Sequence, residues 1–150
     1  MNDIRVRRAR RADAAAIARL AGQFTADEGG GKDPMSEAAI LRHGFGPRRL
    51  FWILVATRAD DVLGYALVYP GYDGGESTPG LHLSDLFVRA DARRQGVGRA
   101  LMDGVAADTR RMGGAWYTWF VAHTNADGRA FYDRVGAKVM PSTPLYVELG

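Results

Sequence analysis

Cysteine is absent from this chain of 150 residues. Its absence excludes disulfide bonds, thiolate metal sites and a cysteine nucleophile. Histidine is scarce, and His43, His82 and His123 stand far apart in the sequence, so we expect no metal site. Apolar runs are short, and none approaches the roughly 20 residues that span a bilayer. We therefore expect no membrane partner.

The N-terminal segment Met1–Arg11 is charged and lacks the apolar stretch of a secretory signal, so we expect a cytoplasmic protein. The composition, 47% hydrophobic and 25% charged, is typical of soluble globular proteins. A chain of 150 residues is also long enough to bury one substantial core. We predict a single domain over residues 1–150.

Positive charge is in slight excess, with a formal net charge of +3, and it is unevenly placed. Arginines gather in two runs, at Arg5–Arg11 and at Arg89–Arg99. A nucleic-acid-binding domain would more often show one continuous basic face with interleaved aromatic residues. We interpret the first run as solvated surface and expect no nucleic-acid partner. Steep salt-dependent binding to DNA or RNA would support the alternative.

Hydrophobic periodicity and turn residues predict one α+β domain in the order β-α-α-β-β-β-α-β-α-β-β. Asp13 is expected to cap the first helix, and Gly71–Gly80 to form an irregular loop. The expected strands are Ile4–Arg7, Leu50–Thr57, Val62–Tyr69, Leu81–Val88, Ala115–Ala122, Ala137–Met140 and Leu145–Leu149. After the helix that follows Asp13, the expected helices are Glu37–His43, Gly98–Met112 and Gly128–Val135.

The stretch Leu81–Met102 places a glycine turn between a strand and a helix. Its pattern Arg93-x-x-Gly96-x-Gly98 lets backbone amides approach an anion at the helix N-terminus. A dinucleotide fingerprint would need a third glycine and a later acidic residue, and a P-loop would need Gly-Lys-Ser/Thr. Both are missing. We expect this stretch to hold a phosphate-bearing cofactor of another kind.

Two stretches together resemble the GCN5-related N-acetyltransferase (GNAT) superfamily: DLFVRADARRQGVGRALM at Asp85–Met102, and Asn125–Ala137 with its Ala130-Phe131-Tyr132. Within the superfamily, the diamine (spermidine/spermine) acetyltransferase group is the most similar. The resemblance covers nearly the whole chain and implies a three-layer fold with a mixed, mostly antiparallel sheet. It also implies transfer of an acetyl group from acetyl-CoA to a small-molecule primary amine in a ternary complex, and it makes a homodimer an expectation.

The resemblance assigns a role to several residues. Backbone groups of Leu86, Phe87 and Val88 would pair with the pantetheine arm of the cofactor, and the N–H of Phe87 would stabilise the oxyanion. Asn125 would bond the cofactor arm, and Tyr132 would protonate the departing CoA thiolate. The pyrophosphate would be held by backbone amides and nearby side chains of Arg93, Arg94, Gln95, Gly96, Val97, Gly98 and Arg99.

The chain departs from the polyamine enzymes at Ser84, where those enzymes typically carry glutamate. A serine cannot serve as the same base, so the base stays open between Asp85, Glu28 and Asp73. With Ser84 and Trp119, these acids are the expected acceptor-binding residues. Acids and aromatic residues together favour a cationic amine, and the alternative is that the acids only solvate their loops.

Other functions remain open. Ser84 in place of the base favours a module that binds acetyl-CoA without catalysis. The acceptor could also be a protein N-terminus or a lysine, and the donor another acyl-CoA.

The acid role of Tyr132 can be tested with Tyr132→Phe. Removal of the phenol should lower the turnover number, because the thiolate then leaves without a proton donor. The affinity for acetyl-CoA should stay nearly unchanged. Steady-state kinetics and a binding titration measure the two effects, and unaltered turnover would exclude Tyr132 as the acid.

Overall fold

The structure, a computed structural model, describes residues 3–150. Internal contacts divide the chain into two compact units, Met1–Phe120 and Val121–Gly150. The first unit contains the sheet and three helices, and the second contains the last helix and the C-terminal segment. Within residues 3–150, no helix has the length and apolar character needed to cross a membrane.

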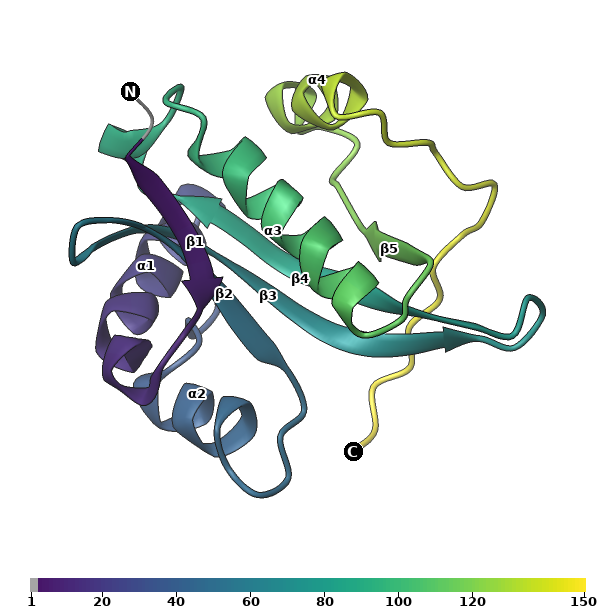
Figure 1. The fold of residues 1–150 in the computed structure, drawn as a ribbon, viewed down its shortest axis with the longest axis horizontal. Helices are drawn as coiled ribbons and strands as arrows, with labels where there is room; N and C mark the ends of the chain where they lie inside the picture. Colours follow the sequence, from purple (N-terminus) through teal and green to yellow (C-terminus); the bar gives the residue numbers. More distant parts are fainter. Residues whose placement is uncertain (1–2) are drawn as a thin grey trace. The chain divides into compact units, whose positions relative to one another are not determined.

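The first unit is built on a five-stranded sheet in which strands adjacent in the sequence are neighbours, in the order β1-β2-β3-β4-β5 (Figure 1). The first four strands pair antiparallel, and β5 pairs parallel to β4. The predicted mixed, mostly antiparallel sheet is therefore confirmed. The strands are β1 (Ile4–Arg8), β2 (Trp52–Arg58), β3 (Asp61–Asp73), β4 (Thr78–Val88) and β5 (Trp116–Trp119).

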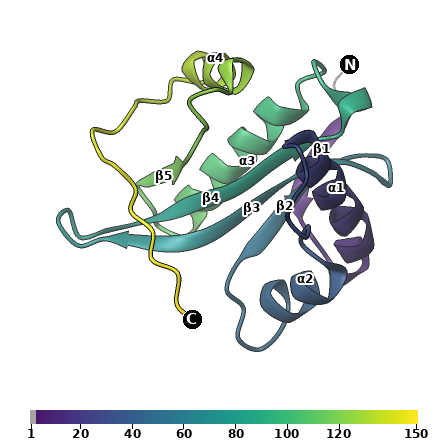
Figure 2. The ribbon, with the colours of Figure 1, turned by 180° about the vertical axis from the view of Figure 1, so that it is seen from behind.

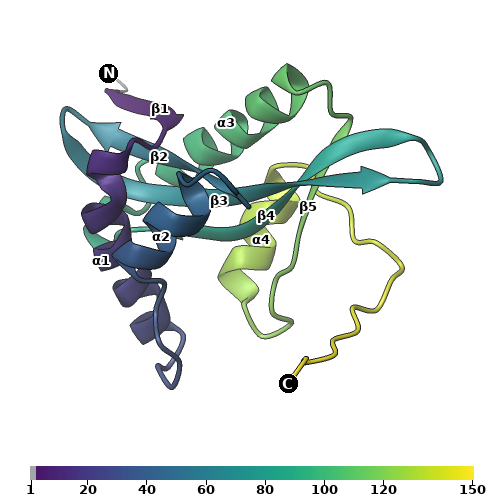
Figure 3. The same cartoon turned by 90° about the horizontal axis from the view of Figure 1, so that it is seen from below.

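Helices cover both faces of this sheet. Two helices, α1 (Ala14–Asp27) and α2 (Glu37–Gly44), lie side by side on one face (Figure 2), and α3 (Val97–Arg111) lies on the other (Figure 3). The apolar positions of α1, such as Ile17 and Leu20, are buried against strand residues that include Tyr65. This layering agrees with the predicted α+β, three-layer class.

A buried carboxylate anchors α3 to the first two strands. Asp108 is almost fully buried in α3, and it accepts hydrogen bonds from Arg8 Nε (3.2 Å) and Trp52 Nε1 (2.9 Å). Arg111 pairs with its other oxygen. A buried charge is tolerated only when it is paired and hydrogen-bonded. Asp108 therefore links α3 to both β1 and β2.

The β3–β4 hairpin is longer than predicted. The prediction of an irregular loop at Gly71–Gly80 is wrong, because β3 continues to Asp73 and β4 begins at Thr78. Gly71 and Gly80 pair in register, and the ring of Trp116 from β5 packs against Gly80 where a Cβ would otherwise stand. Asp73 closes the remaining turn by accepting hydrogen bonds from the N–H groups of Gly75 and Glu76.

The first helix also begins differently from the prediction. Asp13 makes no side-chain cap of α1, because a short 3₁₀ turn, η1 (Arg11–Asp13), precedes the helix. Its carboxylate instead accepts hydrogen bonds from the Arg10 N–H (2.6 Å) and from Arg7 (2.7 Å). The same carboxylate therefore ties the entry of α1 to β1.

The second unit contains α4 (Ala126–Arg134), and Asn125 caps this helix by accepting a hydrogen bond from the Gly128 N–H. The prediction of strands at Ala137–Met140 and Leu145–Leu149 is wrong, because residues 137–150 form neither helix nor strand. Their apolar side chains are exposed, for example 95% at Val139 and 92% at Leu145. A strand needs a hydrogen-bonded neighbour, and this segment pairs with none in the described structure.

The role of Asp108 predicts a stability difference between two acids of α3. Asp108→Ala leaves Arg8 and Trp52 without their acceptor, and it should lower the free energy of unfolding by about 2–4 kcal/mol. Asp103→Ala is the matched control, since Asp103 is exposed and pairs with Arg99 at 3.5 Å; it should cost less than about 1 kcal/mol. Urea unfolding measures both free energies. Equal decreases in the two variants would contradict the role of Asp108 in anchoring α3 to β1 and β2.

Candidate functional site

The segment between β4 and α3 is a candidate for binding an anion, and we call its residues 94–99 the anion-binding loop. Arg94 and Gly96 have positive φ angles of 60° and 86°, and the helix begins at Val97. The first helical hydrogen bond of α3 is donated by the Ala100 N–H to the Gly96 carbonyl. The preceding N–H groups have no intrahelical acceptor. Such a concave row of amides at a helix N-terminus binds anions.

Side chains hold the anion-binding loop against the turn between β2 and β3. Gln95 accepts a hydrogen bond from Arg58 (3.0 Å) and donates one to the Asp91 carbonyl (3.0 Å). Arg89 forms a bidentate pair with Asp61 at 2.8 and 2.9 Å. The side chains of Arg94 and Arg99 are exposed beside the loop.

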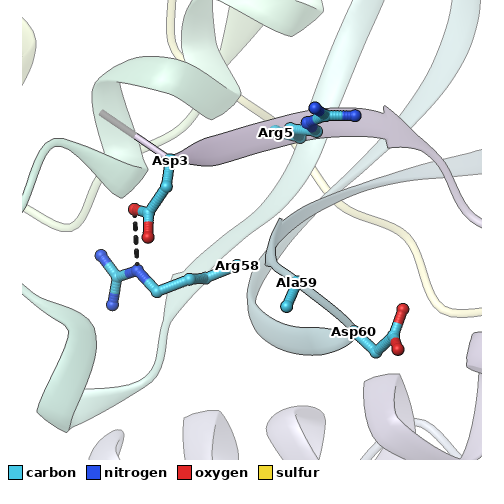
Figure 4. Close-up of a pocket in the computed structure, with 5 residues that line it drawn as sticks. All are labelled: Asp3, Arg5, Arg58, Ala59 and Asp60. Carbon is cyan, nitrogen blue, oxygen red and sulfur yellow. Dashed lines mark hydrogen bonds and ion pairs between the residues drawn. The ribbon is translucent and has the colours of Figure 1, made fainter. Parts of the chain in front are cut away.

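A surface hollow of about 600 Å³ lies at β1 and the β2–β3 turn. Figure 4 shows the pair between Arg58 Nε and Asp3 (2.9 Å) within it. The hollow is lined by Asp3, Arg5, Arg58, Ala59 and Asp60, and it contains none of the predicted site residues. The candidate site is therefore defined by β4 and the anion-binding loop.

The side of β4 that faces β5 is only partly paired. The two strands pair from Gly80 and Trp116 to Leu83 and Trp119, and no strand of residues 3–120 continues this pairing. We call residues 84–88 on this side the open edge. An extended amide chain can bind such an edge as an added strand would. The open edge leads directly towards the anion-binding loop.

Hydrogen bonds at the end of β4 show which amides face the open edge. Arg89 N–H donates to Leu63 of β3, whereas the Val88 carbonyl points away from β3 and accepts from Arg93 Nε (2.9 Å). Antiparallel pairing alternates these directions, so the N–H groups of Leu86 and Val88 face the open edge. The N–H of Phe87 points to β3. The N–H of Phe87, which is the expected oxyanion donor, therefore does not face the open edge.

A β-bulge at Ser84 decides the orientation of Asp85. Leu83 pairs with Val68 and Asp85 pairs with Leu67, so Ser84 has no partner in the β3 register. The extra residue places Asp85 on the same sheet face as Phe87 and Tyr65, the face that α1 covers. Ser84 itself is exposed, and its hydroxyl donates a hydrogen bond to Asp85 Oδ1 (3.2 Å).

The charges of Asp85 and Glu28 both act on Tyr65. Burial raises the pKa of the Asp85 carboxyl, the Ser84 hydroxyl partly opposes this, and the negative charge of Glu28 raises it further. Burial also raises the pKa of the Tyr65 phenol, and the charges of Asp85 and Glu28 add to the effect. A carboxylate with a raised pKa can accept a proton from a cationic amine more readily than an ordinary one.

Two predicted acceptor-binding residues lie elsewhere. The carboxylate of Asp73 closes the hairpin turn through Gly75 and Glu76. Trp119 stacks on Tyr117 (5.4 Å), and alternation along β5 places both on the sheet face opposite to that of Trp116. From the predicted set, the structure joins Ser84 to Asp85 by a hydrogen bond, and the charge of Glu28 acts on Asp85.

The sequence interpretation missed an aromatic cluster on the sheet face of Asp85. His82 lies between Tyr69 and Trp116, with ring centroids 5.1 and 5.4 Å apart, and its Nδ1 is 2.6 Å from Thr118 Oγ1. Only strand alternation could have indicated the cluster, and the bulge at Ser84 interrupts that alternation.

The remaining predicted residues, Asn125 and Tyr132, belong to the second unit. The side-chain oxygen of Asn125 caps α4, which leaves its amide nitrogen for a further partner. Burial raises the pKa of the Tyr132 phenol, so this group stays protonated at neutral pH. Among residues 3–150, no three His, Asp or Glu side chains are grouped so that they could hold a metal ion.

An open mixed sheet with an anion-binding loop after its fourth strand defines an acyltransferase architecture. Residues 18–137 match the model of the family described as Acetyltransferase (GNAT) family. The chain belongs to this family of acetyltransferases, which use acetyl-CoA as co-substrate. The predicted family membership, fold and enzyme class are confirmed.

Individual proteins also show similarity. The chain is 32% identical over 78 residues to L-ornithine N5-acetyltransferase NATA1 of Arabidopsis thaliana, a match of 52% of this chain and 34% of that protein. The chain thus spans about a third of the length of this relative.

Two solved structures share the fold. They are an aminoglycoside acetyltransferase from an uncultured soil metagenomic sample (TM-score 0.82, 16% identity, 99% of this chain and 98% of that chain) and a ribosomal-protein-alanine N-acetyltransferase from Brucella melitensis (TM-score 0.80, 18% identity, 98% and 100%). At these identities the likeness concerns the fold alone.

The raised pKa of Asp85 predicts a pH-dependent stability. Because the folded state binds the proton of Asp85 more tightly than the unfolded state, the wild type loses stability as the pH rises above the ordinary carboxyl pKa of about 3.9. Asp85→Asn, which carries no charge, should therefore unfold at higher urea than the wild type at pH 7. The difference should shrink as the pH falls towards 4.

Glu76→Gln is the control, since Glu76 is an exposed acid of the β3–β4 turn. Its effect should be small and should not follow this pH trend. An Asp85→Asn variant that is no more stable than the wild type at pH 7 would contradict a raised pKa of Asp85 in the folded protein.

Proposed function

We propose that the chain transfers the acetyl group of acetyl-CoA directly to a primary amine of a small cationic acceptor. The observation that carries this proposal is the position of Asp85. It lies on the strand whose open edge leads to the anion-binding loop, and its side chain is on the sheet face that α1 covers, where the negative charge of Glu28 contributes to its raised pKa. The edge proposed to bind the cofactor and the carboxylate proposed to bind the amine are therefore both on β4.

The cofactor would be held by groups that the fold leaves without partners. The first amides of α3 and the side chains of Arg94 and Arg99 would bind the pyrophosphate. The N–H groups of Leu86 and Val88 would pair with the pantetheine arm, and Asn125 would donate to it from α4. Acetyl-CoA supplies an activated thioester, so no acyl-enzyme is required.

Asp85 would accept the proton of the amine. An alkylammonium has a pKa of about 10.4, so only about one amine in 2,500 is uncharged at pH 7. The half-buried carboxylate of Asp85, with its raised pKa, is better matched to this transfer than an exposed acid. Glu28 would help to attract the cation. The Ser84 hydroxyl would orient Asp85 and would not act as the base.

The transition state needs a hydrogen-bond donor and an acid. As the free amine attacks the thioester carbonyl, the N–H of Leu86 or Val88 at the open edge would stabilise the oxyanion. Tyr132 would then protonate the CoA thiolate. Its raised pKa keeps the phenol protonated until that step.

The charges and rings beside β4 favour a linear acceptor with a terminal amine. One ammonium would lie at Asp85 and Glu28, and a second cationic or polar end would lie along the face of Tyr69 and Trp116. The relative named for L-ornithine N5 acetylation supports a terminal amine on a short chain. Within this class, diamines and ornithine-like amino acids are both candidates.

A single domain over 1–150 is part of the proposal, and the family match across both units supports it. A homodimer is proposed on the resemblance alone, and a cytoplasmic location on the composition, which lacks cysteine. A module that binds acetyl-CoA without catalysis is the second candidate, because Ser84 replaces the glutamate of the polyamine enzymes.

The test is CoA release from acetyl-CoA with a panel of diamines, polyamines, ornithine, lysine, aminoglycosides and an N-terminal alanine peptide. We expect kcat/KM for linear diamines or ornithine to exceed that for the peptide by at least about tenfold. Isothermal titration with acetyl-CoA is measured in parallel. Cofactor binding without turnover of any amine would reject catalysis and favour the binding module.

A further inference from the structure

We propose that Arg93 is a positioning residue for the acceptor side of the site and not a contact of the cofactor. Its side chain fastens the C-terminal end of α1, which carries Glu28, to the end of β4, which carries Asp85. This inference rests on the proposed function, since it assigns Arg93 to the amine-binding half of the same site.

The contacts of Arg93 turn it away from the anion-binding loop. Its NH2 group donates to Asp27 Oδ2 (2.7 Å), and its Nε donates to the Val88 carbonyl (2.9 Å). The guanidinium also lies 5.4 Å from the centre of the Phe87 ring. Both donated bonds and the ring contact therefore lead to α1 and β4, although Arg93 directly precedes the loop in the sequence.

The end of α1 meets the same ring. Phe24 stacks on Phe87 with centroids 5.2 Å apart and an interplanar angle of 12°. Glu28 follows Asp27 directly, and its N–H donates to the Phe24 carbonyl (3.1 Å). The Phe87 ring thus contacts both Phe24 of α1 and the guanidinium of Arg93. Asp27 completes the connection by pairing with Arg93.

Beyond Glu28, the N–H groups of Gly29 and Gly30 donate to the Ala26 and Thr25 carbonyls, so these bonds cap α1 but do not connect it to β4. Three glycines, Gly29–Gly31, follow with positive φ angles, and a Cβ at any of them would meet no atom within 4 Å. The position of Glu28 relative to Asp85 therefore depends on the last turn of α1. That turn is held to β4 by Phe24 and by the Arg93–Asp27 pair.

The expected effect is moderate. The pair is half exposed, with side-chain exposures of 46% and 51%, so the ion pair alone contributes little. The bond to the Val88 carbonyl and the ring contact add to it. Loss of all three should loosen the helix end without unfolding the sheet.

The experiment compares Arg93→Gln with Arg94→Gln, its exposed neighbour beside the loop. Arg93→Gln should raise the KM for the best amine by about five- to tenfold, while the Kd for acetyl-CoA from calorimetry stays within about twofold. Arg94→Gln should show the opposite pattern. A rise in the Kd for acetyl-CoA in Arg93→Gln equal to that in Arg94→Gln would overturn the proposal.

A double-mutant cycle tests the partner. Asp27→Asn should raise the same KM, and the double variant Asp27→Asn, Arg93→Gln should add little to either single change. Arg93→Lys keeps the charge but cannot make both donated bonds, so it should recover only part of the loss. Full additivity of the two single changes would show that Arg93 does not act through Asp27.

Hydrogen exchange supplies a readout that needs no substrate. The amides of residues 24–28 should exchange faster in Arg93→Gln and Asp27→Asn than in the wild type, and unchanged exchange would overturn the proposal. If the wild type acetylates no amine, the proposed function fails. The exchange data and the Kd for acetyl-CoA would still decide whether Arg93 holds α1 or binds the cofactor.

Discussion

The site depends on the unequal pairing of β4. On one side this strand pairs with β3 along almost its whole length, and on the other it pairs with β5 only from Gly80 to Leu83. The first contact makes the strand rigid, and the second leaves backbone amides unpaired. Unpaired amides on a rigid strand can bind a ligand without paying the entropy of ordering a loop. Both halves of the proposed site are built on this strand.

Charged groups around β4 are divided between the two halves. Arginines and amides gather at the anion-binding loop, and the charges of Asp85 and Glu28 act on Tyr65 on the side covered by α1. Burial keeps the proton affinity of Asp85 high, which costs stability but suits a base. Arg93 lies between the halves, and its contacts connect the acidic side to β4. Stability is recovered elsewhere, for example at the anchored carboxylate of Asp108.

Local signals were enough to predict much of the fold. The apolar run around Val55 and the glycines at Gly96 and Gly98 identified a buried strand and the start of α3, because these preferences act within a few residues. Gly71 and Gly80 looked like loop residues, yet Trp116 from another strand makes them part of the hairpin. The segment after Ala137 has strand-like residues such as Val147, but local preference supplies no partner strand.

The sequence by itself determined the family, the anion-binding loop and the presence of acids near the site, since each is carried by residue types at a short spacing. Only the tertiary structure decided which acids meet. The bulge at Ser84 places Asp85 on the sheet face that α1 covers, while hairpin closure takes Asp73 to the far end of the strand. A one-residue shift in a strand reverses every later side chain. That shift depends on how β4 pairs with β3, and this pairing cannot be predicted from the local sequence of β4.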